Sequence, residues 1–165
     1  MKNLPVCKAC VDSALCNQCQ EKFDKGLVTQ FDLDLAKDFI ELEKKFPDLK
    51  KLSFYNAVDT GNIVFLVVGG GQKEKFTKEI LKEVKDIYEL KEIQMIEKGP
   101  VKEMLEQIIA PAKLFGINQI YIPTGETEYR VVISKEDKDK IKVPLNLLEK
   151  ASSIIIRGIA KIEFS

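Results

Sequence analysis

All four cysteines of this 165-residue chain lie within its first 19 residues. They form two Cys-x-x-Cys pairs, Cys7 with Cys10 and Cys16 with Cys19, separated by five residues. Each pair can curl into a turn that points two thiolates at one spot, and two such turns provide the tetrahedral sulfur set that zinc prefers in structural sites. Because about 20 residues cannot bury enough apolar surface to offset their ordering entropy, the segment should fold only with its metal. We therefore predict a knuckle that binds one zinc ion.

Three other interpretations of the cysteines stay open at this stage. The pairs could form a redox-active disulfide, they could be unlinked surface cysteines, or they could hold an iron–sulfur cluster. The chain has no histidine and offers no obvious fifth ligand, so a bound ion is expected to be structural rather than catalytic.

Composition limits the remaining possibilities. The chain is 45% hydrophobic and 32% charged, which is ordinary for a globular protein, and no stretch is apolar enough to predict a membrane span or a secretory signal. We expect a cytoplasmic protein with no membrane partner. The formal net charge is zero, so nucleic-acid binding would need a local basic patch. No nucleophile and base can be assembled, which predicts a non-enzyme without a small-molecule substrate.

The pattern after Gly26 predicts alternating helices and strands. A helix capped by Asp32 is expected over 32–46, followed by strands at 52–58 and 63–68, an uninterrupted helix over 73–90 and a strand at 93–96. The run 63–68 is entirely apolar and is typical of a buried strand.

The second half repeats this order. We expect a helix from residue 101 that Pro111 breaks or kinks and that ends at Gly116, then strands at 119–122 and 128–134. A helix over 144–156 capped by Gly158 and a final strand at 160–164 should follow. Two helix–strand–strand–helix–strand units in succession suggest an internal structural duplication. Each unit should build a three-stranded mixed sheet with helices on one face.

The predicted fold class is therefore α+β, with an N-terminal four-cysteine knuckle and two small α-β-β-α-β units. The corresponding domains are a zinc ribbon or knuckle at 1–26, a first α/β unit at 27–98 and a C-terminal α/β unit at 99–165.

Several segments of the chain resemble a known family. They are the zinc knuckle, residues 57–66 (AVDTGNIVFL), residues 109–118 (IAPAKLFGIN), residues 121–125 (YIPTG) and residues 128–131 (EYRV). Together they resemble archaeal zinc-ribbon proteins with a KH domain, described as NusA-like transcription elongation or termination factors, over nearly the whole chain. The resemblance implies an RNA-binding protein with a zinc ribbon, a prokaryotic-type KH module and a smaller C-terminal α/β unit.

One feature of that family is missing here. A KH module normally has a Gly-x-x-Gly loop between two short helices, where the backbone clamps nucleic-acid phosphates. Between residues 68 and 93 the chain has only the glycine run 69–71 and then one helical pattern. The first unit is therefore a degenerate KH-like unit, and binding of single strands in the usual KH groove is in question.

Candidate nucleic-acid contacts fall into two groups. Backbone amides of Gly70 and Gly71, with Lys73, Lys75 and Lys78, could face a phosphate. Interleaved glutamates favour the alternative, a flexible turn followed by a solvated helix face. The second group is Lys113, Arg130 and Lys142, which could reach phosphates or could simply be solvated.

These observations lead to two functional hypotheses. The first is a non-catalytic RNA-associated factor of the transcription machinery, with RNA and RNA polymerase as partners. The second is a ribosome- or protein-binding adaptor that has lost the KH clamp.

Overall fold

The centre of the molecule is β2 (Ile63–Val68), whose six residues are all buried in the computed structural model, which describes residues 1–165. Alternate side chains of a strand point to opposite faces of its sheet, so burial of all six requires cover on both faces. β1 (Phe54–Asp59) pairs with β2 in antiparallel fashion and β3 (Glu92–Glu97) pairs with it in parallel. These strands lie within two residues of the predicted positions.

The helix before the first sheet, α3 (Gln30–Leu42), starts earlier than predicted. Thr29, not Asp32, is the N-cap; Thr29 Oγ1 accepts from the Asp32 N–H, and Asp32 accepts in return from the Thr29 N–H at 2.9 Å. This capping box satisfies two of the donors that a helix start leaves unpaired. The second oxygen of Asp32 accepts the Ala57 N–H at 2.7 Å, so the same carboxylate joins α3 to β1.

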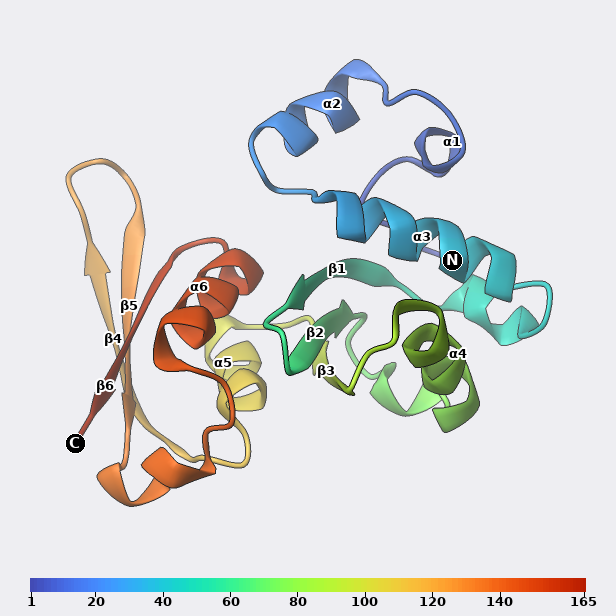
Figure 1. The fold of residues 1–165 in the computed structure, drawn as a ribbon. Helices are drawn as coiled ribbons and strands as arrows, with labels where there is room; N and C mark the ends of the chain where they lie inside the picture. Colours follow the sequence, from blue (N-terminus) through green and yellow to red (C-terminus); the bar gives the residue numbers. More distant parts are fainter.

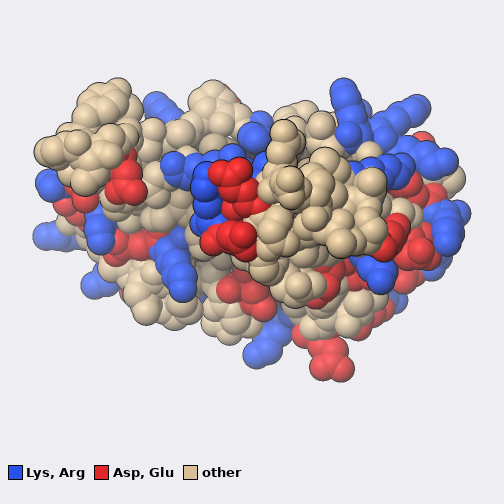
Figure 2. Space-filling model, turned by 90° about the horizontal axis from the view of Figure 1, so that it is seen from above, with Lys and Arg blue, Asp and Glu red and all other residues tan.

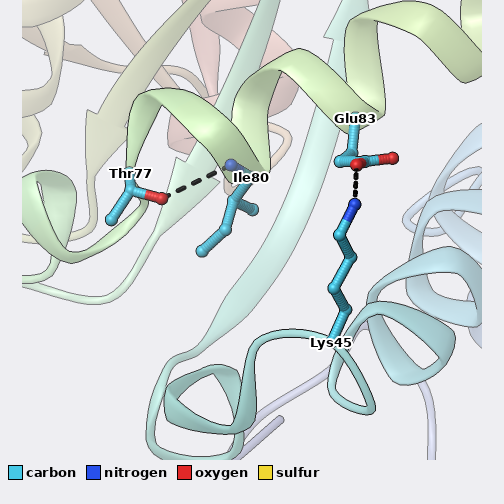
Figure 3. A network of polar contacts seen from close by, with 4 residues as sticks. All are labelled: Lys45, Thr77, Ile80 and Glu83. Carbon is cyan, nitrogen blue, oxygen red and sulfur yellow. Dashed lines mark hydrogen bonds and ion pairs between the residues drawn. The ribbon is translucent and has the colours of Figure 1, made fainter.

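The predicted uninterrupted helix over 73–90 is wrong. The chain instead forms a short 3-10 turn, η2 (Lys73–Lys75), and then α4 (Lys78–Tyr88). The break lies at Phe76, whose side chain is buried, and at Thr77, whose hydroxyl accepts from the Ile80 N–H as the new N-cap. Figure 3 shows this cap together with the ion pair between Glu83 of α4 and Lys45. Core burial of Phe76 therefore outweighs the helical charge pattern around it.

The second unit consists of six elements: α5 (Val101–Ile109), β4 (Leu114–Tyr121), β5 (Thr127–Ile133), η3 (Lys135–Lys140), α6 (Leu145–Ile156) and β6 (Ile159–Phe164). Gly116 was predicted to end α5, and this prediction is wrong. Gly116 lies inside β4, opposite Val132. The helix stops at Ile109 before Pro111, so β4 begins five residues earlier than expected and is eight residues long.

The two units share topology down to backbone details. In each sheet the first pair of strands is antiparallel and the second is parallel. Each first strand has an irregularity after its first residue, with the aromatic Tyr55 or Phe115 as the extra residue. Each second helix ends in a left-handed residue that is not glycine, Glu89 in α4 and Arg157 in α6. These matches support a structural duplication.

The units are stacked in four layers (Figure 1): α3 and α4, the first sheet, α5 and α6, and the second sheet. Even-numbered residues of β2 pack with α3 and α4 in one core, and odd-numbered residues pack with α5, α6, β5 and β6 in the other. Helices therefore cover both faces of the first sheet rather than one, because the second unit supplies its other cover. None of the helices combines the length and apolar composition needed to cross a bilayer.

Asp32→Ala should lower the free energy of unfolding by about 1–3 kcal/mol, because the buried Ala57 N–H loses its acceptor and the helix loses the capping contact to the Thr29 N–H. Burial raises the pKa of Asp32, while hydrogen bonds from Thr29 and Ala57 oppose that shift. Denaturant titration measures the loss. Asp34→Ala, at an exposed position of the same helix, is the control and should change stability by less than about 0.5 kcal/mol. Equal effects of the two substitutions would contradict this account of Asp32.

Candidate metal centre and inter-unit groove

The four cysteine thiols converge on one point. Their Sγ atoms all lie within 4.8 Å of one another, and those of Cys7 and Cys19 are 3.6 Å apart. No pair is joined as a disulfide. A tetrahedral ion with metal–sulfur distances of about 2.3 Å places its sulfurs about 3.8 Å apart, so the four residues fit a single ion. The predicted metal ligands are therefore brought together.

Two short helices create this convergence. Cys7 is the N-cap of α1 (Lys8–Val11) and Cys16 is the N-cap of α2 (Asn17–Asp24), so each pair places its second cysteine in a first helical turn. The two loops also exchange contacts, since the Cys7 N–H donates to Cys19 Sγ at 3.4 Å and the Cys16 N–H to Cys10 Sγ at 3.3 Å. Backbone amides directed at sulfur stabilise thiolates, as a metal ligand set requires.

The thiols influence one another strongly. Hydrogen bonds with Cys19 and Cys16 raise the pKa of Cys7 to about 11, whereas the Cys19 backbone and thiol lower the pKa of Cys16 to about 7. Adjacent thiols that share protons in this way cannot all ionise together unless a cation neutralises them. Lys8 and Lys22 line the same surface depression as Cys7 and provide part of the positive charge.

The knuckle has a small core of its own. Cys10 and Cys19 are buried with Val6 and Val28, and Leu33 of α3 packs against them. This cluster is separate from the two larger cores, so it contributes little to the packing of the sheets. The chain before the knuckle is tied to the first sheet, where the Phe54 N–H donates to the Asn3 carbonyl at 3.0 Å.

A second feature, which the sequence did not predict, is a groove of about 540 Å³ between the two units. Asn56 of β1 and Leu27 lie on one side of it, and Tyr129 and Arg157 of the second unit lie on the other. A second hollow of about 300 Å³ shares Leu27 with it and continues along α6. The groove therefore exists only because the units stack.

Two cations lie beside this groove without acidic partners. Lys98 follows β3, and its Nζ sits 4.1 Å from the centre of the Tyr55 ring. Burial and the neighbouring Arg157 lower the pKa of Lys98. Neither cation has a carboxylate within 4.0 Å, although seven ion pairs form elsewhere. Glu126 is the only carboxylate among the residues that line the groove.

The backbone at Arg157 is held in an unfavourable conformation. Arg157, not Gly158 as predicted, is the left-handed cap of α6, with φ 55° and ψ 47°. A left-handed non-glycine residue costs about 1–2 kcal/mol. Gly158 serves another purpose, because a Cβ there would lie 3.1 Å from the Tyr129 ring. Gly158 therefore allows close packing against β5, and the left-handed position falls one residue earlier, as it does at Glu89 in the first unit.

None of the predicted nucleic-acid residues lines this groove, although Gly70 lies next to Lys98, where a Cβ would come within 3.2 Å of the Lys98 carbonyl oxygen. Five of them lie in the turn and helix start after β2: Gly70, Gly71, Lys73, Lys75 and Lys78. Arg130 lies in the middle of β5 at the opposite end of the molecule (Figure 1) and pairs with Glu128 at 3.3 Å and with Glu163 at 4.0 Å. Lys113 and Lys142 lie in loops next to β4 and η3. Their roles stay predictions.

Charge is also mixed over the surface. On the face shown in Figure 2, lysines and arginines are interspersed with acidic residues, and neither sign covers the whole face. No sequence pattern pointed to Lys98 and Arg157, because they are 59 positions apart and become neighbours only through the stacking of the units. The aromatic residues Tyr55 and Tyr129 were visible, but nothing in the pattern connected them to a cation.

Comparison with known proteins gives the fold and no family. No family model matches the chain, and no curated protein matches it. Among solved structures, one titled "Crystal structure of APE1850" has a TM-score of 0.54 and 14% sequence identity, and the alignment covers 76% of this chain and 96% of that chain. At that identity the likeness shows the shared fold alone.

Removal of the metal should unfold the knuckle and leave the two sheets intact. Because the knuckle's small core is separate, Cys10→Ser or a strong chelator should expose residues 7–28 to protease and to hydrogen exchange while amides of β2 stay protected. Ser13→Ala, an exposed change between the cysteine pairs, is the control and should retain the metal. If a metal-free chain keeps full protection over residues 7–28, the site is not what folds the segment.

Proposed function

We propose that the metal is a single zinc ion with a structural role. A multi-iron cluster distributes its four thiolates over two or four irons and therefore needs some sulfurs farther apart than those of a single ion, whereas here all four lie within 4.8 Å. The donor set of four thiolates suits zinc, and complete use of its coordination positions leaves none for a substrate.

Elemental analysis of the purified chain tests the identity of the ion. One zinc per chain without iron is expected, and the protein should be colourless because zinc has a filled d shell. Iron at one equivalent, with visible thiolate-to-iron absorption, would replace this proposal with a mononuclear iron site.

We further propose that the chain is a non-catalytic RNA-associated factor of the transcription machinery, and that it binds RNA in the inter-unit groove. The observation that carries the RNA proposal is two neighbouring cations without acidic partners, Lys98 over the Tyr55 ring and Arg157 on the groove wall. RNA provides phosphates for the cations and unstacked bases for aromatic rings. Tyr129 and the Asn56 amide on the groove wall add a second ring and a hydrogen-bonding group.

The strained conformation of Arg157 also supports this site. Backbone strain in a non-glycine residue is frequent at functional sites and persists where the surrounding structure holds it. The equivalent residue in the first unit is Glu89, which has the same left-handed backbone but the opposite charge. The two positions therefore share their backbone geometry and differ in charge, and only the positive charge of Arg157 would attract a phosphate.

Arg157→Gly should weaken binding of single-stranded RNA without loss of stability, because glycine adopts the left-handed conformation freely. Lys98→Ala should add to the loss. Each removed phosphate contact should lower the slope of log K against log salt by about 0.7. Fluorescence anisotropy with a short labelled RNA, at several salt concentrations, measures both quantities.

Matched variants separate the groove from other surfaces. Glu89→Gly makes the same backbone change away from the groove and should leave RNA affinity unchanged. Glu126→Gln removes the single lining carboxylate and should strengthen binding. Lys75→Ala tests the glycine–lysine surface predicted from sequence. RNA affinity that is absent even at low salt, or that falls with Lys75→Ala but not with Arg157→Gly, would overturn the groove proposal.

A second candidate function is a ribosome- or protein-binding adaptor. It is favoured by the zero net charge and by the mixed charges in Figure 2. Affinity capture from native extract distinguishes the two candidates: RNA polymerase subunits support a transcription factor, and ribosomal subunits without direct RNA binding support the adaptor.

A further inference from the structure

The strand β4 forms an unusually unprotected sheet edge. Its eight residues, LFGINQIY, include no charged residue in a chain that is 32% charged. Tyr121 and Phe115 are 76% and 75% exposed. Natural proteins protect exposed edges with charges, proline or covering segments, because an open row of N–H and C=O groups attracts another strand.

The other three sheet edges of this protein are protected. On β1 the Ala57 N–H donates to Asp32 at 2.7 Å, and on β3 the Glu97 N–H donates to the Gln107 side chain at 2.7 Å. On β6 the Ala160 N–H donates to Ser153 Oγ at 2.9 Å, and charged side chains alternate along the strand. Along β4 no such bond forms; only Lys113, just before the strand, is capped.

Beyond the irregularity at Phe115, three residues of β4 have backbone N–H and C=O groups that are not bonded to β5. The Ile122 N–H donates to the Glu126 carbonyl at 2.9 Å, which fixes the phase of the hairpin's hydrogen bonds. Antiparallel pairs alternate between bonded and non-bonded, so Ile120 and Asn118 bond to β5. The backbone groups of Ile117, Gln119 and Tyr121 therefore point away from β5. In Figure 1 the loop end of the β4–β5 hairpin stands clear of the helices, and no other strand of the molecule pairs with the outer edge of β4.

We propose that β4 pairs with β4 of a second copy of this chain, antiparallel about a two-fold axis at Gln119. The three free residues are symmetric about position 119. The axis pairs Gln119 with its own copy and Ile117 with Tyr121 of the other copy, and two three-stranded sheets become one six-stranded sheet.

The charge pattern selects a second copy as the occupant. Pairing β4 with itself brings no two like charges together, because neither strand carries any. It also places an aromatic residue opposite a β-branched one, a favourable cross-strand pair, and two amide side chains opposite each other on the axis. β1, β3 and β6 all include charged residues, so β4 is the strand of this chain best suited to pair with β4.

Sedimentation velocity over a range of protein concentrations tests the proposal. The unmodified chain should show a monomer–dimer equilibrium. Gln119→Lys and Gln119→Glu each place like charges on the axis and should weaken the dimer by about fivefold. Because Gln119 is exposed and its backbone does not bond β5, both variants should fold normally, which circular dichroism checks.

Mixing the two variants is the decisive measurement. Equimolar Gln119→Lys and Gln119→Glu chains place opposite charges on the axis, and the mixed dimer should be tighter than either variant alone. Lys161→Glu, a charge change at the protected edge β6, should leave the dimer unaffected. A chain that is monomeric at every concentration, assemblies larger than a dimer, or variants that dimerise like the unmodified chain would each overturn the proposal.

Discussion

Burial of β2 on both faces is the constraint on which the rest of the structure depends. A strand with apolar residues at every position has no face to offer to water, so a two-layer unit built around it would be incomplete. The second unit completes it: α5 and α6 cover the face of β2 that α3 and α4 leave open. The inter-unit groove follows from this packing, because it lies where the two units meet.

The four-cysteine knuckle depends much less on apolar packing than the two sheets do. Its residues make few apolar contacts beyond a cluster of four buried residues, and its geometry comes from two helix starts that each place two thiols. A small core of that kind needs a metal as a cross-link. The protein therefore combines a scaffold stabilised by apolar packing with an N-terminal segment whose four converging thiols can hold a metal ion.

Sequence patterns predicted the parts of the structure that local chemistry controls. The spacing of Cys7, Cys10, Cys16 and Cys19 indicated one metal site, and the apolar run 63–68 indicated a buried strand; both predictions are confirmed. Errors arose where tertiary contacts outweighed the local pattern. Burial of Phe76 interrupts the expected long helix, and Gly158, expected to cap α6, instead packs against Tyr129 while Arg157 is the cap. The meeting of Lys98 with Arg157 required knowledge of how the units stack, which no pattern in either unit contains.

The two repeats are related by stacking in the same direction rather than face to face. Each unit presents helices on one side and a sheet on the other, so the sheet of the first unit receives the helices of the second, and the sheet of the second could receive a third. That outer face carries Arg130 between Glu128 and Glu163, an ion-paired row that another layer of apolar helices would have to desolvate. These charges give the outer face of the second sheet a polar character, as the capping repeats of solenoids have.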